Sequence, residues 1–544
     1  MAAPTNVADG LFKAANAWQV STDLAWHNTE VAPDELVYKS LPHVDSVDIF
    51  VSHSWDCSSW MKYLALCQFL NFNMAANSAV LAWISTALFL LLRAGGVIEL
   101  AVSMAGTNFL TYSLVYFPMA VFCLVYFFGH TLCRKTFWFD RICVNQTDLE
   151  LKAKALDALP HFVANSSEML ILLDEKYLER LWCNYEIAIF SRRSRGPQSM
   201  HFMPLWLPIW ILSTVAIDFL GVLALTVCMP TGSAGVDPPE SEADTRLGFF
   251  LLTFEAWTAP GLVYAFSVIF SFVVHYRRLQ FHNTLLDRMA SFDFRDAKCK
   301  LESDRALIES QIVHLFDEAY EPPLRVAIDV PEDVHPTTEA DMPLISQEVM
   351  HAIRPITSYP SEEEVLQQFN AYVRGPMREN LLNAIGSEVD IPWKLCAVSF
   401  LPLTFDALAV TLGCEGQPCH MSAKHEGYAS SATYVISNFL GFAIECFLGY
   451  PSIHPIMLRV LRVFTSSVDH LSLRLVLGAL SAITVYVYVF SSAAAVIGFL
   501  MVSITRFSPA WLAAGIVTFT ILTAQSCMLF LKGKVHLPSC RMLS

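Results

Sequence analysis

Long apolar segments constrain the fold of this chain more than any other feature of its sequence. A helix that crosses a bilayer needs about 20 mostly apolar residues. Charged residues make up only 16% of the chain, against roughly 25% in soluble proteins. The sequence therefore predicts an integral, multi-pass α-helical membrane protein in which the lipid bilayer is the first partner. Eight segments are candidate spans: 76–93, 111–133, 204–229, 247–274, 394–413, 431–450, 476–502 and 509–531.

The distribution of Lys and Arg predicts how these segments are oriented. One set of loops carries fourteen Lys and Arg residues near the span ends, and the alternate set carries four. Positively charged loops stay in the cytosol, so eight spans place both termini there. The alternative is an odd count, in which a weak segment such as 76–93 is a buried core helix. The N-terminus lacks the features of a signal peptide, so internal segments are expected to direct insertion into a membrane whose identity stays open.

Removing the spans leaves cytosolic blocks, of which residues 277–392 are the most acidic, with 21 Asp and Glu against 11 Lys and Arg. An amphipathic helix is expected at 285–316, where Ile308 and Ile312 recur at helical spacing. A Pro-rich stretch follows, and a further helix is expected at 361–385. A linker or docking surface is the expected role of this block. The predicted divisions are an N-terminal cytosolic segment (1–45), a module at 46–207 interrupted by a membrane hairpin at 76–133, spans three and four (204–274), the acidic region (277–392), spans five to eight (394–531) and a cytosolic tail (532–544).

Charge and cysteine usage exclude two classes of function. A formal net charge of −15 argues against a nucleic-acid partner, because phosphate binding needs clustered Lys and Arg. The 14 Cys residues are scattered without CxxC or Cys/His pairs at zinc-ligand spacing, so no metal site is predicted. Cys414 and Cys419 lie in a predicted outer loop. On the oxidising side of the membrane they could form a disulfide that closes a small loop.

Short apolar strands alternate with helices in the first two cytosolic blocks. Residues 47–54 (VDIFVSHS), the start of TFWFDRICVNQTD and residues 169–173 each form an apolar run that ends in polar residues. Such alternation builds a parallel sheet, in which ligands bind outside the carboxyl ends of the strands. The sequence therefore predicts that polar side chains converge there: Ser52, His53, Ser54, Trp55, Asp140, Arg141, Asp174 and Glu175.

The same segments resemble TIR (Toll/interleukin-1 receptor-like) domains. FVSHSW is similar to their first strand and loop, FWFDRICVNQ to the second, and RLWCNYEI to the helix after the third strand. FDRICVNQ also resembles fungal heterokaryon-incompatibility (HET) domains. Together the motifs cover about 100 residues. The resemblance implies a cytosolic α/β module of flavodoxin-like fold, and either NAD cleavage or TIR–TIR self-association as its signalling activity.

What the resemblance implies can be stated residue by residue. Glu186 matches the catalytic acid of TIR domains that cleave NAD, and Trp182 matches an aromatic that lines the nicotinamide pocket. NAD would then be a substrate, with no bound cofactor. Ser52, His53, Trp55 and Asp140 would contact the ligand from the strand ends. The alternative for Glu186 is a solvated helix residue, and for His53 a structural hydrogen bonder.

A second class of function stays open. Four predicted spans each carry one acid: Asp218, Glu255, Asp406 and Glu445. Intramembrane carboxylates are costly and often functional, so these residues could line a proton or cation path in a transporter that the TIR-like module regulates. Protonated or interface-facing acids are the alternative. A cavity joining these acids would favour transport, whereas a pocket uniting Ser52, Trp182 and Glu186 would favour NAD cleavage.

Overall fold

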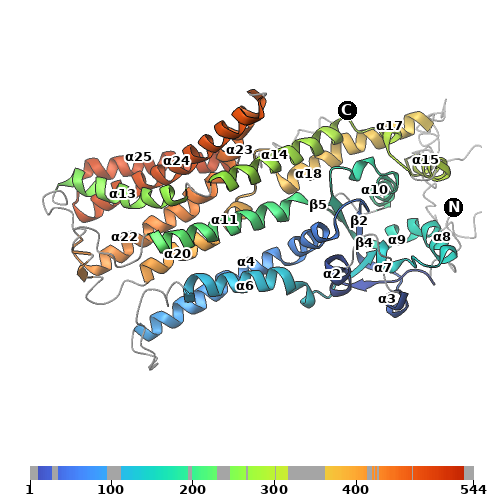
Figure 1. Cartoon of the computed structure of the whole chain (residues 1–544), viewed down its shortest axis with the longest axis horizontal. Helices are drawn as coiled ribbons and strands as arrows, with labels where there is room; N and C mark the ends of the chain where they lie inside the picture. The colour runs from blue at the N-terminus through green and yellow to red at the C-terminus, as the bar shows by residue number, and fades with distance from the viewer. Residues whose placement is uncertain are drawn as a thin grey trace, which may run out of the picture.

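Long helices run side by side, and a small sheet module lies at one end of them (Figure 1). The computed structural model describes residues 10–531 except 27–34, 95–111, 194–198, 229–244, 265–267, 300–301, 317–361, 413–419, 422, 425–427 and 468–469. The predicted Pro-rich stretch, the Cys414–Cys419 pair and the C-terminal tail lie outside the described residues.

The sheet has five strands in the order β1-β3-β2-β4-β5. β2, β3, β4 and β5 run parallel, and β1 pairs antiparallel with β3 at the edge. The three strands predicted from the sequence are therefore neighbours in one sheet, with the first of them in the middle, and this prediction is confirmed. Their bounds are β1 (Ala15–Asn16), β2 (Val47–His53), β3 (Thr136–Phe139), β4 (Ser166–Leu173) and β5 (Met200–Pro204).

The central strands are apolar because both of their faces are covered. In β2, Ile49, Phe50 and Val51 are at most 2% exposed. Phe50 stacks on Trp138 of β3 with ring centroids 4.6 Å apart. The Asp148 side chain accepts from two backbone N–H groups at the start of α8, an N-cap that fixes where this helix begins. The helices around the sheet are α2 (Ala17–Trp26), α3 (Glu35–Ser40), α7 (Asp140–Cys143), α8 (Leu149–Asp157), α9 (Leu159–Ala164) and α10 (Leu181–Arg193).

A helical hairpin separates β2 from β3 in the sequence without separating them in space. α4 (Ser59–Ala94) leaves the sheet and α6 (Phe117–Phe128) returns to it. The two helices are joined where the Asn71 amide donates to the Tyr126 carbonyl at 2.8 Å and the Tyr63 hydroxyl to the Phe127 carbonyl at 3.0 Å. With 36 residues, α4 is about 54 Å long, well beyond the roughly 30 Å hydrocarbon core. Its first turns therefore extend to the sheet module.

Among the described residues, six helical segments are long and apolar enough to cross a membrane: Ser59–Leu92, Ser113–Leu132, Trp206–Leu225, Ser431–Phe464, Ser472–Thr505 and Pro509–Phe530. They correspond to six of the eight predicted spans. The predicted spans at 247–274 and 394–413 contain α13 and α20, which are not among the six within the described residues. The helices after β5 are α11 (Trp206–Cys228), α13 (Arg246–Tyr264), α14 (Val268–Ala290), α15 (Glu302–Phe316), α17 (Glu362–Tyr372), α18 (Arg378–Ile385), α19 (Trp393–Ser399), α20 (Leu401–Leu412), α22 (Ser431–Ile444), α23 (Ile453–Ser467), α24 (Leu471–Thr505) and α25 (Pro509–Phe530).

The described part of the acidic region packs on the sheet module. Ile308 and Ile312 of α15 are fully buried, and the Tyr185 hydroxyl on α10 donates to Gln311. The single helix predicted at 285–316 is wrong, because α14 ends at Ala290 and α15 begins at Glu302. Between them Asp293 caps a short 3-10 turn, Phe294–Asp296. A side chain that caps its own backbone competes with helix continuation there.

The predicted orientation can be tested with reporter tags. We expect tags at both ends of the chain to be protected from a membrane-impermeant label in intact cells, because the Lys- and Arg-rich loops hold their side in the cytosol. A tag inserted at 232–240 should be labelled. Labelling of one terminus but not the other would mean an odd number of spans.

Candidate functional site

The order in which the chain adds parallel strands to the sheet reverses at β2. From β2 the chain continues to β3 on one side, and β4 then lies on the other side of β2. At such a switch point the loops leave a crevice outside the carboxyl ends of the strands, where open α/β sheets bind ligands. Ser52 is the penultimate residue of β2, Asp140 follows β3, and Asp174 and Tyr177 follow β4. Polar side chains therefore gather at this edge of the sheet.

A cluster of three side chains joins β2 to α10 at this point. The Ser52 hydroxyl donates to Oε2 of Glu186 and shares a 2.5 Å hydrogen bond with the Tyr177 hydroxyl. Ser52 is completely buried, so it acts on Glu186 rather than on solvent. Burial raises the pKa of Glu186 well above its usual range; the negative charge of Asp140 adds to this, and the Ser52 hydrogen bond opposes it. The cluster presents a carboxyl group that retains its proton to higher pH than usual.

Asp140 organises a second cluster beside the first. Its carboxylate lies 2.9 Å from Nε2 of His53 and accepts a 2.8 Å hydrogen bond from the Trp55 indole. Nδ1 of His53 faces the Ser54 carbonyl at 3.1 Å. Both imidazole nitrogens thus lie within hydrogen-bonding distance of an oxygen atom. Burial raises the pKa of Asp140, but His53, the Trp55 hydrogen bond and Lys62 outweigh it and hold the pKa below its usual range.

Two further charged groups complete the surroundings of the crevice. Burial raises the pKa of Asp174, against the opposing charge of Lys62 in the first turn of α4. Lys62 is itself only 2% exposed. At the outer edge, Arg180 and Asp56 form an ion pair that links the loop after β4 to the loop after β2. The site therefore contains both cationic and anionic side chains, placed next to one another.

The sheet brings most of the predicted site residues to one edge, but in two groups. Ser52 meets Glu186, whereas His53 and Trp55 meet Asp140. The described ring contact of Trp182 is an edge-on packing against Tyr185, with centroids 6.1 Å apart.

Sequence reasoning missed Tyr177 and Lys62. Tyr177 lies just after a strand end, the same signal that singled out Asp174, but no motif marks it. Among the described residues, no group of three or more His, Cys, Asp or Glu side chains could hold a metal ion.

The four acids of the predicted spans do not share one site. Asp218 accepts from the Tyr264 hydroxyl at 2.7 Å and from the Leu403 backbone N–H at 2.9 Å, so its carboxyl group joins α11, α13 and α20. Glu445 accepts from the Tyr450 hydroxyl. Glu255 is exposed. A cavity of ≈ 10 Å³, about one water molecule, is lined by Asp218, but neither Glu255 nor Asp406 lines it.

Comparison of the chain with protein-family models, with curated proteins and with solved structures finds no match. The class of the chain therefore rests on its own architecture. Its described residues include six helices of membrane-spanning length and composition, and a small mixed sheet with a cluster of polar side chains at its switch point.

Proposed function

We propose that this chain is a membrane-anchored signalling protein whose TIR-like module cleaves NAD, with Glu186 as the catalytic carboxylate. The observation that carries the proposal is the position of Glu186, at the switch point of the parallel strands and hydrogen-bonded by Ser52. The strand sequence β3-β2-β4-β5 also supports it, because it is the 2-1-3-4 order of flavodoxin-like sheets. Self-association of the module is the form of signalling that remains if NAD is not cleaved.

The reaction needs a carboxylate beside the ribose. The nicotinamide–ribose bond breaks with its electron pair leaving on nicotinamide, and the ribosyl group passes through an oxocarbenium-like state, as in glycoside cleavage. Water then adds to the ribosyl carbon and releases a proton, giving ADP-ribose and nicotinamide. Ionised Glu186 would stabilise the developing cation. Ser52 is a positioning residue, since its hydroxyl fixes one carboxyl oxygen from a buried site.

Direct connections between the module and the long helices support a signalling role. β5 ends at Pro204 and α11 begins at Trp206, while α4 begins six residues after the end of β2. One continuous hydrophobic core includes Val51 of β2, Ala75 of α4 and Ile211 of α11. Packed cores transmit displacement because they leave few voids. A rearrangement of the helices would therefore reach the strands that carry Ser52.

The pH dependence of NAD consumption tests the proposal. The purified full chain, dispersed and clustered on a support, should consume NAD faster as pH rises above the range in which an ordinary Glu ionises. The sign follows because only the ionised carboxylate stabilises a cation, and burial has raised the pKa of Glu186. On the acid side the rate should rise about tenfold per pH unit. No NAD consumption by the clustered protein would refute the enzymatic activity, and a rate that falls with pH would refute Glu186 as an ionised catalytic group.

The transport alternative is supported by one observation. The cavity beside Asp218 is also lined by Tyr264, Ser271, His454 and Tyr486, and His454 lies 2.9 Å from Nε2 of His275. A buried polar chain of this kind is a candidate proton path. Proton uptake into proteoliposomes that carry the wild type but not Asp218→Asn would favour this alternative.

A further inference from the structure

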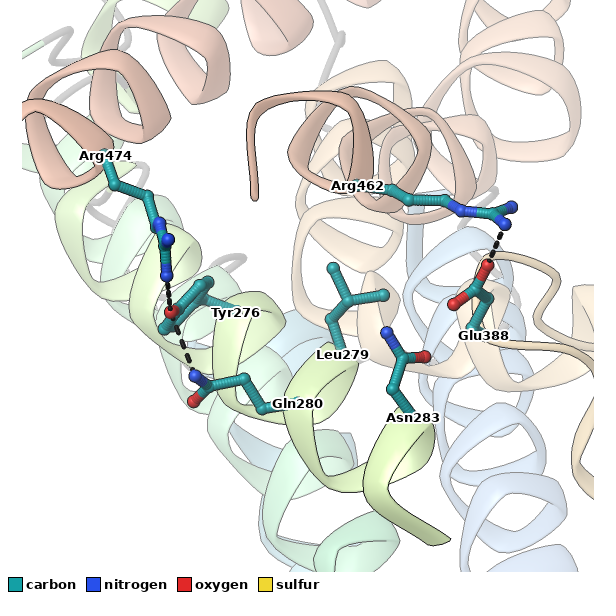
Figure 2. A pocket seen from close by; sticks show the side chains of 7 residues that line it. All are labelled: Tyr276, Leu279, Gln280, Asn283, Glu388, Arg462 and Arg474. Carbon is teal, nitrogen blue, oxygen red and sulfur yellow. Dashed lines mark hydrogen bonds and ion pairs between the residues drawn. The ribbon is translucent and has the colours of Figure 1, made fainter. Parts of the chain in front are cut away.

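A pocket of ≈ 400 Å³ lies between α14, α23 and α24, away from the sheet crevice. Figure 2 shows Tyr276, Gln280 and Asn283 on successive turns of α14. Arg474 of α24 meets Tyr276 on one side of the pocket, and Arg462 of α23 meets Glu388, in the loop after α18, on the other. Cationic and neutral hydrogen-bonding groups therefore dominate its lining.

Two polar groups of the pocket, the Tyr276 hydroxyl and the side-chain oxygen of Asn283, are suited to binding a phosphorylated polyol. The Tyr276 hydroxyl accepts from Arg474 at 3.1 Å and from Gln280 at 2.9 Å, which leaves its own proton to donate to an anion. Oδ1 of Asn283 is buried and has no hydrogen-bond partner, so it can accept from a ligand hydroxyl. Guanidinium groups bind phosphate with two parallel hydrogen bonds.

The pocket lies just beyond the predicted hydrocarbon core on the cytosolic side. Tyr276 follows the predicted span 247–274 by two residues, and Arg474 precedes the predicted span 476–502 by two residues. The helix Ser472–Thr505 has 34 residues, more than the roughly 20 that cross the core, so its first turns extend into the headgroup layer. Basic pockets between membrane helices on the cytosolic side bind phosphorylated lipid headgroups.

From these positions we infer that the pocket binds the headgroup of a multiply phosphorylated inositol lipid of the cytosolic leaflet. Arg462 and Arg474 hold the phosphates, Tyr276 donates a hydrogen bond, and Asn283 accepts one from an inositol hydroxyl. The inference is independent of the NAD chemistry proposed for the sheet module, because no residue is shared between the two sites.

The Glu388 carboxylate competes with an anionic ligand for the Arg462 guanidinium group. It pairs with Arg462 at 2.6 Å, where the Arg462 side chain is 58% exposed and the Glu388 side chain 19%. Because the guanidinium group is accessible to solvent, an entering phosphate can compete with the carboxylate for it. Removal of the Glu388 charge should therefore strengthen binding, an effect opposite in sign to the loss of either arginine.

The test uses the detergent-solubilised full chain and three probes: dioctanoyl phosphatidylinositol bisphosphate, dioctanoyl phosphatidylserine and free inositol trisphosphate. Affinity is measured by titration calorimetry. We expect the inositol lipid to bind at least about tenfold more tightly than phosphatidylserine, because it offers more phosphate oxygens to the two guanidinium groups. Arg462→Ala and Arg474→Ala should each weaken binding about tenfold or more, and Glu388→Gln should tighten it several-fold.

Arg277→Ala is the matched control, since Arg277 is an exposed cation next to Tyr276 that does not line the pocket. Its affinity should stay within about threefold of the wild type, as expected for a cation that acts only through the general surface potential. Equal weakening by Arg277→Ala and Arg474→Ala would overturn the inference, because general surface charge and not the pocket would then account for lipid binding. Binding of free inositol trisphosphate without any binding of the lipid would overturn a lipid source and assign the pocket to a soluble phosphate ester. Tighter binding by Glu388→Gln together with weaker binding by Arg474→Ala would support the inference.

Discussion

Glu186→Gln is expected to lower NAD consumption by about 10²–10³-fold, the usual effect of removing one preorganised charge that stabilises a transition state. The amide keeps the size of the side chain and can still accept the hydrogen bond from Ser52. What it removes is the negative charge opposite the ribosyl cation. The measurement is the rate of nicotinamide release by clustered, purified protein at the pH where the wild type is fastest.

The stability of the same variant separates a catalytic role from a structural one. Because burial raises the pKa of Glu186, the native state binds more protons than the unfolded chain between the ordinary and the raised pKa. Stability therefore falls as pH rises through that interval. A Gln side chain does not ionise and so avoids the cost of burying a charge. Glu186→Gln should therefore unfold at the same or a higher temperature than the wild type at pH 8.

Two other results would count against this assignment. Equal activity of Glu186→Gln and the wild type would move the catalytic carboxylate to Asp174 or Glu175, the acids at the neighbouring strand end. A variant that loses both activity and thermal stability would identify Glu186 as a structural link between β2 and α10.

The strands of the module could be predicted because each is a short apolar run with a clear polar end. The run at 47–54 matches β2, and the parallel sheet followed from the alternation of strands with helices. β1 could not be predicted, since two residues carry no pattern and their pairing with β3 spans about 120 residues of sequence. The spacing of Ile308 and Ile312 predicted a buried face on α15. Its partner, α10, lies more than 100 residues away and leaves no local signal.

The candidate site was predictable at the level of the sheet edge and not at the level of individual contacts. The carboxyl ends of β2 and β3 lie at the same edge of the sheet, so Ser52 and Asp140 are placed there whatever conformation the loops adopt. Whether Ser52 turns toward Glu186 or His53 toward Asp140 depends on side-chain directions fixed by packing. The burial of the Ser52 hydroxyl and the contribution of Tyr177 follow from that packing alone.

Asp23→Ala is expected to destabilise the attachment of the N-terminal segment to the sheet by about 3–5 kcal/mol. Asp23 on α2 and Arg141 on α7 form an ion pair at 2.9 Å, with side chains only 6% and 4% exposed. Removing Asp23 takes away the carboxylate with which this buried guanidinium group pairs. Hydrogen–deuterium exchange of the α2 amides should accelerate by more than about a hundredfold, because local opening then costs less free energy.

The double variant Asp23→Leu, Arg141→Met distinguishes a charge effect from a loss of packing. Both charges are then absent and apolar side chains fill the space, an exchange that is often neutral or stabilising for buried pairs. We therefore expect exchange in α2 to return close to the wild-type rate. Glu35→Ala is the matched control, since its pair with Lys39 is 49% and 65% exposed and should contribute less than about 1 kcal/mol. If the double variant exchanges as fast as Asp23→Ala, the contacts of these side chains, and not their charges, hold α2 against the sheet. Because Arg141 directly follows Asp140, loss of this attachment should also loosen the carboxylate that His53 and Trp55 contact.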